Sequence, residues 1–176
     1  MSDRSKFFYW TQLQTQDPSS TKEKNSDLDD HSIISIDAET ARLWPGCAEF
    51  IASQSLFFLA SANWDGQCQC NFQSGEPGFV LVEDNKYLYF PDYRKNGRPT
   101  ILGNFIENPY VGLLFVDFQT KISVKVNGKV TILEKPEQLE PFYKHAAYRK
   151  AVRIIRVEIE YVASNCLELP AEENSE

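Results

Sequence analysis

Residues 90–118 read FPDYRKNGRPTILGNFIENPYVGLLFVDF, and they join an apolar strand end to a second apolar strand through a loop rich in positive charge. Arg94, Lys95 and Arg98 lie within five residues of one another in this loop. A short helix is expected over residues 99–108, because proline suits the first turn of a helix. Cations that lead into a helix N-terminus suit a phosphate group, since unpaired backbone N–H groups and the helix dipole both favour an anion there. On charge clustering alone, however, a solvated turn is the commoner explanation.

Short strands are expected on both sides of this loop. Apolar runs, alternation and turn residues place them at residues 56–60, 67–73, 79–82, 87–90, 111–118, 122–127, 129–133 and 152–162. Further helices are expected at residues 38–44, 47–51 and 136–150. Gly128 is expected to allow a bend between two of the strands. Many short strands in succession favour an antiparallel barrel, and the chain lacks the glycine fingerprint of a Rossmann fold.

The composition is that of one folded domain with an acidic surface. Of the 176 residues, 42% are hydrophobic, which is enough for one substantial core. We expect an N-terminal segment at residues 1–36 with a flexible part at 17–31, a barrel domain at 37–166 and an acidic tail at 167–176. The net charge of −7 argues against nucleic acid or an anionic membrane as a partner. Because neither an apolar run of membrane-spanning length nor a signal peptide is found, a cytoplasmic location is expected.

The cysteines and histidines are not spaced for a metal site or an activated nucleophile. Cys47, Cys68, Cys70 and Cys166 form no zinc or redox motif, so no metal is expected. Cys68 and Cys70 lie two apart on an expected strand and therefore share a face. We expect the cysteines to serve as small buried hydrophobic residues. The two histidines have no suitably spaced serine or cysteine partner, so hydrolysis through a nucleophile is not expected.

Four motifs in a fixed order carry a resemblance to a known family. They are GEPGFV at residues 75–80, NG at 96–97, LGN at 102–104 and NPYVGLLF at 108–115. With DGQCQCNFQSGEPGFVLVED upstream and KISVKVNGKVTIL downstream, they resemble the pyridoxamine 5′-phosphate oxidase-like family over about residues 49–165. The resemblance implies a mainly β fold with flanking helices, an antiparallel FMN-binding split β-barrel, in which residues 37–166 bind the flavin.

The resemblance also implies where FMN would be bound. Its phosphate and ribityl chain would be held by the loop after the fourth strand and by the second strand, and its ring would run beside the end of the fourth strand. The implied cofactor-binding residues are Asn71, Phe72, Gln73, Ser74, Phe90, Pro91, Arg94, Lys95, Asn96, Arg98, Asn104 and Ser123. Two of them depart from the vitamin-salvage oxidases of this family. Gln73 stands where those enzymes have a basic residue, and Ser123 stands where they have a glutamine with a longer reach.

The C-terminal sequence separates this chain from the vitamin-salvage oxidases. Those enzymes end in a segment rich in tryptophan and arginine that completes both the flavin and the pyridoxine sites. This chain has no tryptophan after Trp64 and no arginine after Arg156, so that activity is not expected. The pair Asn165-Cys166 resembles an uncharacterised subgroup with an Asn-Cys-Pro ending, although Leu167 replaces the proline. For Cys166, a structural thiol is a commoner role than a redox thiol.

Two classes of function remain open at this point. The first is an FMN-dependent oxidoreductase of unknown substrate, which would exchange electrons with a nicotinamide nucleotide or a small molecule. The second is a flavin-binding protein without turnover, such as a sensor or a store. Another flavin, a deazaflavin or haem in the same barrel also remains possible from the breadth of the family. No catalytic residue can be named from the sequence.

A homodimer with the flavin at its interface is the expected assembly. The resemblance implies it, and the apolar residues exceed what one small barrel covers. The excess lies in the cluster Phe7 to Trp10 and in the two-sided apolar run at residues 111–118. The flavin ring would then be completed from the other chain, by a segment around Trp44 or Phe118. Alternatively, the N-terminal aromatic residues fold back over their own barrel.

Overall fold

The computed structural model describes residues 42–43, 45–93 and 100–164, all within one unit of the chain, residues 32–176. Several sequence expectations therefore lie outside the described residues. These are the aromatic cluster Phe7 to Trp10, the flexible part at 17–31, most of the helix expected at 38–44, the loop residues 94–99, the tail 167–176, Trp44 and Cys166. Residues 42 and 43, which are described, are not helical.

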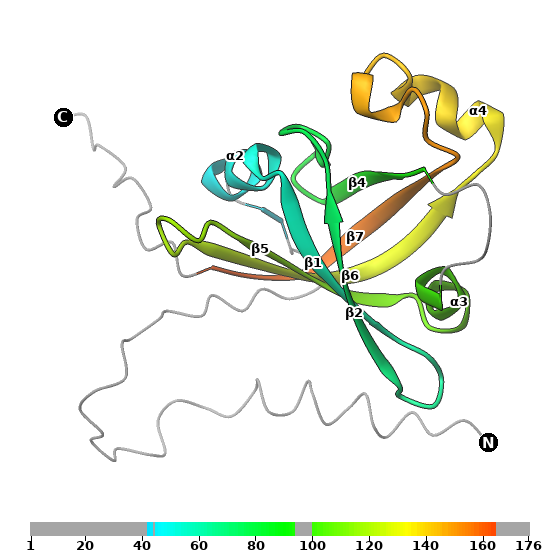
Figure 1. The fold of residues 1–176 in the computed structure, drawn as a ribbon, viewed down its shortest axis with the longest axis horizontal. Helices are drawn as coiled ribbons and strands as arrows, with labels where there is room; N and C mark the ends of the chain where they lie inside the picture. Colours follow the sequence, from blue (N-terminus) through cyan, green and yellow to red (C-terminus); the bar gives the residue numbers. More distant parts are fainter. Residues whose placement is uncertain (1–41, 44, 94–99, 165–176) are drawn as a thin grey trace. The chain divides into compact units, whose positions relative to one another are not determined.

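In the described part of the chain, seven strands form one antiparallel sheet in the order β2-β1-β5-β6-β7-β4-β3 (Figure 1). The strands are β1 (Leu56–Ala62), β2 (Cys68–Ser74), β3 (Leu81–Glu83), β4 (Tyr87–Asp92), β5 (Tyr110–Val116), β6 (Ser123–Leu133) and β7 (Arg153–Ser164). The helices are α2 (Pro45–Ser53), α3 (Thr100–Glu107) and α4 (Pro136–Leu139), followed by the 3-10 turns η1 (Glu140–Phe142) and η2 (Ala146–Tyr148). None of these helices is long and apolar enough to cross a membrane.

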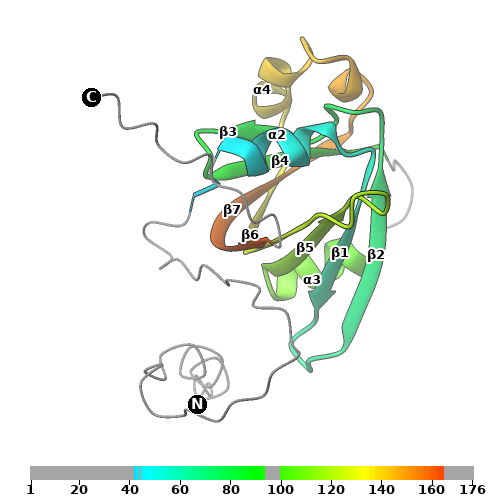
Figure 2. The ribbon, with the colours of Figure 1, turned by 90° about the vertical axis from the view of Figure 1, so that its left-hand side faces the viewer.

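The sheet curls into a split barrel. The ring centroids of Phe57 on β1 and Phe90 on β4 lie 5.1 Å apart. In the order of the sheet, β5, β6 and β7 stand between these two strands, which would place them about 19 Å apart if the sheet were flat. The contact therefore requires strong curvature (Figure 2). Among the described strands, the edge strands β2 and β3 do not pair with each other, so the barrel is open along this line.

Alternating apolar residues of the strands fill the barrel. Along β5, Val111, Leu113 and Phe115 are buried, whereas the residues between them face outward. The same alternation on the other strands gives one core, to which α2 and α3 add their apolar faces. Figure 2 shows α2 beside β3 and β4. The expected antiparallel barrel of short strands with flanking helices is confirmed.

The prediction of one long helix over residues 136–150 is wrong. Only α4 is helical, and two short 3-10 turns follow it. Pro141 lacks a backbone N–H and cannot continue the hydrogen-bond ladder of a helix. His145 is extended, with φ −87° and ψ 129°, which ends any helical path before η2. The apolar residues of this segment still pack inward, and Leu139 and Tyr148 form a second, smaller core with Tyr89 and Ile154.

β6 is one continuous strand, where two strands were expected at residues 122–127 and 129–133. The irregularity expected at Gly128 is present, because the register with β7 shifts between Asn127 and Gly128. Asn127 lies opposite Tyr161 and Gly128 lies opposite Ile159, so β7 carries one extra residue in a bulge.

Tyr148 is a fully buried anchor between this second core and the sheet. Its hydroxyl lies 2.7 Å from the main-chain oxygen of Tyr89 and 3.0 Å from that of Phe79, to which it can donate. Burial raises the pKa of Tyr148 well above its usual value, so the hydroxyl stays protonated and able to donate.

Replacement of Tyr148 by phenylalanine is expected to lower the free energy of unfolding by about 1–2 kcal/mol, because buried carbonyl groups lose a donor. Urea unfolding followed by circular dichroism measures this change. Tyr143→Phe is the matched control, since Tyr143 lies in the same segment but is exposed. Equal stability of the two variants would show that the Tyr148 hydroxyl does not support the fold.

Candidate functional site

The strand that leads into the predicted phosphate loop ends in a buried carboxylate. Asp92 closes β4, and only 6% of it is exposed. Its Oδ2 lies 3.2 Å from Nη1 of Arg153, the first residue of β7. The two residues are direct partners in the ladder between β4 and β7, so their side chains share a face. Glu134 lies on the other side of the guanidinium, 3.7 Å from Nε of Arg153. The base of the predicted loop is thus held to β7 by charge as well as by the ladder.

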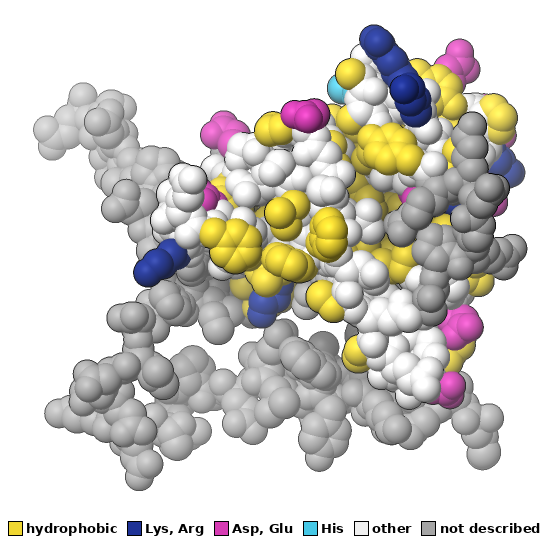
Figure 3. Space-filling model, viewed as in Figure 1, with side chains coloured by type: hydrophobic (Ala, Val, Ile, Leu, Met, Phe, Trp, Pro, Cys, Tyr) yellow, Lys and Arg dark blue, Asp and Glu magenta, His cyan; other side chains and the backbone are white. Residues whose placement is uncertain are grey.

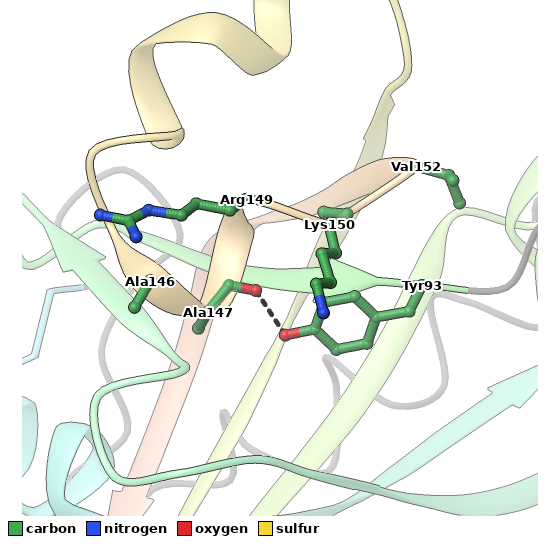
Figure 4. A pocket seen from close by; sticks show the side chains of 7 residues that line it. Tyr93, Ala146, Ala147, Arg149, Lys150 and Val152 are labelled. Carbon is green, nitrogen blue, oxygen red and sulfur yellow. Dashed lines mark hydrogen bonds between the residues drawn. The ribbon is translucent and has the colours of Figure 1, made fainter.

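Beside this strand end lies an open depression (Figure 4). Its lining residues are Tyr93, Ala146, Ala147, Arg149, Lys150, Ala151 and Val152. The Tyr93 hydroxyl donates a hydrogen bond to the main-chain oxygen of Ala147. The backbone N–H of Val152 donates to the main-chain oxygen of Asp92 over 2.9 Å. These two bonds fasten η2 and the segment after it to the end of β4.

Tyr93 is the last described residue before the cationic loop, and it is half-exposed. Partial burial raises the pKa of its hydroxyl above the ordinary value. The hydroxyl is therefore protonated at neutral pH and remains a donor to the Ala147 carbonyl. Tyr93 forms a wall of the depression, with its hydroxyl bonded to the Ala147 carbonyl.

The four predicted residues of β2 do not share one face. Asn71 and Gln73 pair with core residues of β1, whereas Phe72 and Ser74 pair with residues of its outer face. β2 is an edge strand, which leaves Asn71 exposed even though its side chain is on the inner side. A ligand on one side of β2 would therefore meet the side chains of either Asn71 and Gln73 or Phe72 and Ser74.

The other predicted residues lie on separate elements. Phe90 and Pro91 are buried at the end of β4, so their side chains are not open to a ligand. Asn104 of α3 is 5% exposed, and its Nδ2 donates to Ser61 Oγ over 2.9 Å. Ser123 begins β6, and its main-chain oxygen accepts a hydrogen bond from Ser164. Cofactor binding by these residues stays a prediction, and Asn104 has a structural role as well.

Four predicted loop residues, Arg94, Lys95, Asn96 and Arg98, lie outside the described residues. What is described is the start of this loop at Tyr93 and its end at α3. α3 begins at Thr100, as the proline before it predicts, and it packs against β1 through the bond between Asn104 and Ser61. The short helix expected after the loop is confirmed.

The outer face of β1, β2 and β5 carries exposed apolar side chains. Phe72 on β2 lies opposite Phe58 on β1, which lies opposite Leu114 on β5. Phe72 is 66% exposed and Leu114 is 37% exposed. The next row across the sheet contains only small residues, Cys70, Ala60 and Gly112. We call these two rows the outer apolar face; Figure 3 shows hydrophobic side chains gathered in the region of β1 and β5.

The role expected for the cysteines is correct for one of them and wrong for two. Cys47 is buried in the core, as expected. Cys68 and Cys70 share a face, as expected, but both are exposed, because β2 is an edge strand and no described residue covers its outer side. Among the described residues, no group of three or more His, Cys, Asp or Glu side chains could hold a metal ion.

The sequence analysis did not single out Asp92, Arg153 or Lys150, which lie at the base of the loop. Asp92 is the acidic end of an otherwise apolar strand, and this contrast is a signal that could have singled it out. Arg153 and Lys150 lie far along the chain, after a segment read as one long helix. Arg153 lies beside Asp92 through the pairing of β4 with β7, and Lys150 lines the depression with Tyr93; the sequence contains no direct signal for either position.

Comparisons with known proteins agree with this fold. A family model described as pyridoxamine 5′-phosphate oxidase matches residues 43–166. Comparison with curated proteins gave no match. Among solved structures, a Lactobacillus delbrueckii protein provisionally named pyridoxamine 5′-phosphate oxidase is 19% identical, with a TM-score of 0.56 over 69% of this chain and 93% of its own.

Two other solved structures have the same fold. HupZ from Group A Streptococcus is 16% identical, with a TM-score of 0.56 over 68% of this chain and 92% of its own. A Clostridium acetobutylicum protein related to general stress protein 26 is 14% identical, with a TM-score of 0.51 over 68% of this chain and 84% of its own. Identities this low show the fold alone, whereas the family model spans most of the chain. The chain belongs to the pyridoxamine 5′-phosphate oxidase family.

Proposed function

We propose that the protein binds FMN at the end of β4 and acts as a flavin-dependent oxidoreductase. The observation that supports this most is the strand end itself. Asp92 and Tyr93 are held in place by β7 and by the segment after η2, and the sequence continues directly into Arg94, Lys95 and Arg98. A rigid strand that leads into three cations is suited to hold a phosphate group. The main chain at Phe90 and Pro91 would run beside the flavin ring.

The absorption spectrum of the purified protein tests this proposal first. Incubation with FMN followed by desalting should leave a flavin spectrum on the protein. Anaerobic mixing with NADH and with NADPH then tests turnover, because a nicotinamide that delivers a hydride bleaches the oxidised flavin. A protein that retains neither FMN nor another flavin would contradict the proposal.

A flavin-binding protein without turnover is the second candidate. Two tyrosine hydroxyls that contact β4 or the residue after it are engaged with main-chain carbonyl groups: that of Tyr93 with Ala147, and that of Tyr148 with Phe79 and Tyr89. These bonds support the fold, and they occupy the hydroxyls that could otherwise exchange protons. A bound flavin that stays oxidised with both nicotinamide nucleotides would favour this candidate.

Replacement of Arg94 or Lys95 by alanine is expected to weaken FMN binding roughly tenfold or more, because a charge-assisted hydrogen bond to phosphate contributes about 1.5–3 kcal/mol. Quenching of flavin fluorescence on binding measures the affinity. Riboflavin lacks the phosphate, so it should bind weakly to the unchanged protein and equally weakly to both variants. Unchanged FMN affinity in both variants would rule out these residues as phosphate ligands.

We further propose a homodimer in which the outer apolar face is covered by a second copy and the flavin lies at the interface. Proteins of this family are often dimers. Phe72 and Leu114 are more exposed than aromatic and leucine side chains of a strand interior usually are. The neighbouring row of Cys70, Ala60 and Gly112 carries only small side chains, which would allow close approach of a second copy.

Leu114→Glu is expected to shift the protein from dimer to monomer, because two carboxylates would be buried in the interface. The fold should remain, since Lys125 is the cross-strand partner of residue 114 and can pair with the new carboxylate. Light scattering at decreasing protein concentration measures the assembly, with Ile106→Glu on the exposed side of α3 as the control. Flavin should be lost together with the dimer. A monomer that keeps its flavin would refute the shared site.

A further inference from the structure

The edge strand β2 carries two cysteines whose side chains share one face. Cys68 and Cys70 lie opposite Ala62 and Ala60 of β1, on the outer side of the sheet. Both cysteines are exposed, and both are free thiols. Their direct neighbours on β1 are thus small, and on the other side the sheet formed by the described strands ends at β2 (Figure 2). A small ligand can therefore reach both sulfur atoms at once.

The geometry of the strand opposes a disulfide between these two sulfur atoms. Residues two apart on a strand are separated by about 6.4–6.8 Å, and their Cβ atoms point the same way. A disulfide needs Cβ atoms about 3.5–4.5 Å apart. To reach this distance β2 would have to buckle, although each of its residues from Cys68 to Ser74 is paired with β1. The two thiols stay separate, but they are close enough to share one atom that lies between them.

A single metal ion has the right size to bridge the two sulfur atoms. A metal–sulfur bond of about 2.3 Å on each side spans about 4.6 Å when the two bonds are in line. Side chains of a strand lean along its direction, so each sulfur needs to lean by only about 1 Å toward the other. The Cys68 thiol donates a hydrogen bond to the Gly66 carbonyl over 3.5 Å, and this bond has to break. A thiol is a weak donor, so the loss is small.

The number and type of the ligands select the kind of ion. Structural zinc sites use four ligands, whereas the described part of the chain contains no group of three or more His, Cys, Asp or Glu side chains that could hold a metal. β2 also has no carboxylate, the ligand that hard cations such as Mg²⁺ prefer. Cu(I) is a soft ion that prefers thiolates, and two thiolates in line are enough to bind it.

We propose that Cys68 and Cys70 bind one Cu(I) ion per chain as a two-coordinate thiolate site. Each thiol releases one proton to solvent and each sulfur forms one bond to copper, which keeps its +1 charge, so no electron is transferred. Cys70 ends the row of small residues in the outer apolar face, and Cys68 lies one row beyond that face. The site is therefore at the rim of the proposed dimer interface, and it does not depend on flavin binding.

The test is an anaerobic titration of the full chain with Cu(I) in competition with a chromogenic chelator. Cys68→Ser and Cys70→Ser should each bind Cu(I) about a hundredfold more weakly or worse, because the second thiolate of a chelating pair acts at a high effective concentration. Cys166→Ser is the control, since Cys166 is not on β2, and its affinity should equal that of the unchanged protein. Native mass spectrometry should find one copper per chain, and circular dichroism checks that each variant is folded.

Three results would overturn the proposal. The first is equal Cu(I) affinity of Cys68→Ser, Cys70→Ser and the unchanged protein. The second is a loss in Cys166→Ser as large as that in Cys70→Ser, which would indicate a larger site. The third is one copper per two chains, which would mean that thiolates of different chains share the ion.

Leu114→Glu is titrated as well, because a second copy on the outer apolar face would shield Cys70. If this variant binds Cu(I) and the unchanged dimer does not, the site exists and is covered in the dimer. If neither protein binds Cu(I), the proposal is wrong, whatever the flavin content or assembly of the protein.

Discussion

Replacement of Arg153 by methionine is expected to lower the free energy of unfolding by about 3 kcal/mol, because it removes the cation beside the buried carboxylate of Asp92. The Asp92 side chain is 6% exposed and that of Arg153 is 21% exposed. Removal of one member of a buried pair leaves a charge with little solvation, which costs about 3–5 kcal/mol in proteins. The lower end of this range applies, since Arg153 is partly exposed and Asp92 keeps its other interactions.

The matched control is Lys86→Met, which removes an ion pair of the same length. Lys86 Nζ lies 3.2 Å from Glu158 Oε1, but the side chains are 27% and 42% exposed. A pair in this position contributes about 0–1 kcal/mol, because water already solvates both charges. Urea unfolding of the two variants separates the effect of burial from that of distance. Similar free energies of unfolding for the two variants would show that the buried carboxylate of Asp92 is not stabilised by Arg153. The double variant with Asp92→Leu should recover much of the loss, since an apolar pair replaces the isolated charge.

The second large effect is expected for Gly128→Ala, which should destabilise the fold by about 3 kcal/mol or more through overpacking. A Cβ at position 128 would lie 2.2 Å from the main-chain oxygen of Glu158 and 2.9 Å from Val157 Cγ1. The first neighbour is backbone of β7 and cannot rotate away. The bulge between β6 and β7 must therefore open, or the two central strands must separate.

Gly103→Ala is the control for this prediction. Gly103 lies within α3, and a Cβ there would have no described atom within 4 Å. Alanine favours a helix over glycine by up to about 1 kcal/mol, so this variant should be unchanged or more stable. Thermal unfolding of both variants, measured at one protein concentration, gives the comparison. If Gly128→Ala is as stable as Gly103→Ala, the close approach of β7 is not what requires the glycine.

Much of the local structure was readable from the sequence, because it depends on near neighbours along the chain. Apolar runs predicted β1, β4 and β5, and alternation of apolar and charged residues predicted β7. The Asn-Trp-Asp-Gly turn at residues 63–66 predicted the hairpin of β1 and β2. The proline at position 99 predicted where α3 begins. The order of short motifs predicted the family, which the match over residues 43–166 confirms.

The sequence-based predictions failed where a local pattern of residues does not reveal a backbone constraint or the place of a strand in the sheet. The periodic apolar residues of 136–150 favoured one helix, but Pro141 removes a hydrogen bond that such a helix needs. Cys68 and Cys70 were expected in the core, because composition cannot tell a central strand from an edge strand. For Gly128, the sequence predicted an irregularity, and only the approach of Glu158 explains why glycine is required.

The sequence by itself determined most of the strands, the helix α3 and the position of the cationic loop along the chain, since these follow from the chemistry of adjacent residues. Only the tertiary structure decided what surrounds that loop. Asp92 meets Arg153 because β4 and β7 pair in one particular register, and Lys150 lies beside Tyr93 because the chain after η2 is tied to the same strand end. Register depends on how the pleats and the bulge of several strands fit together around one core, and that fit is a property of the assembled sheet.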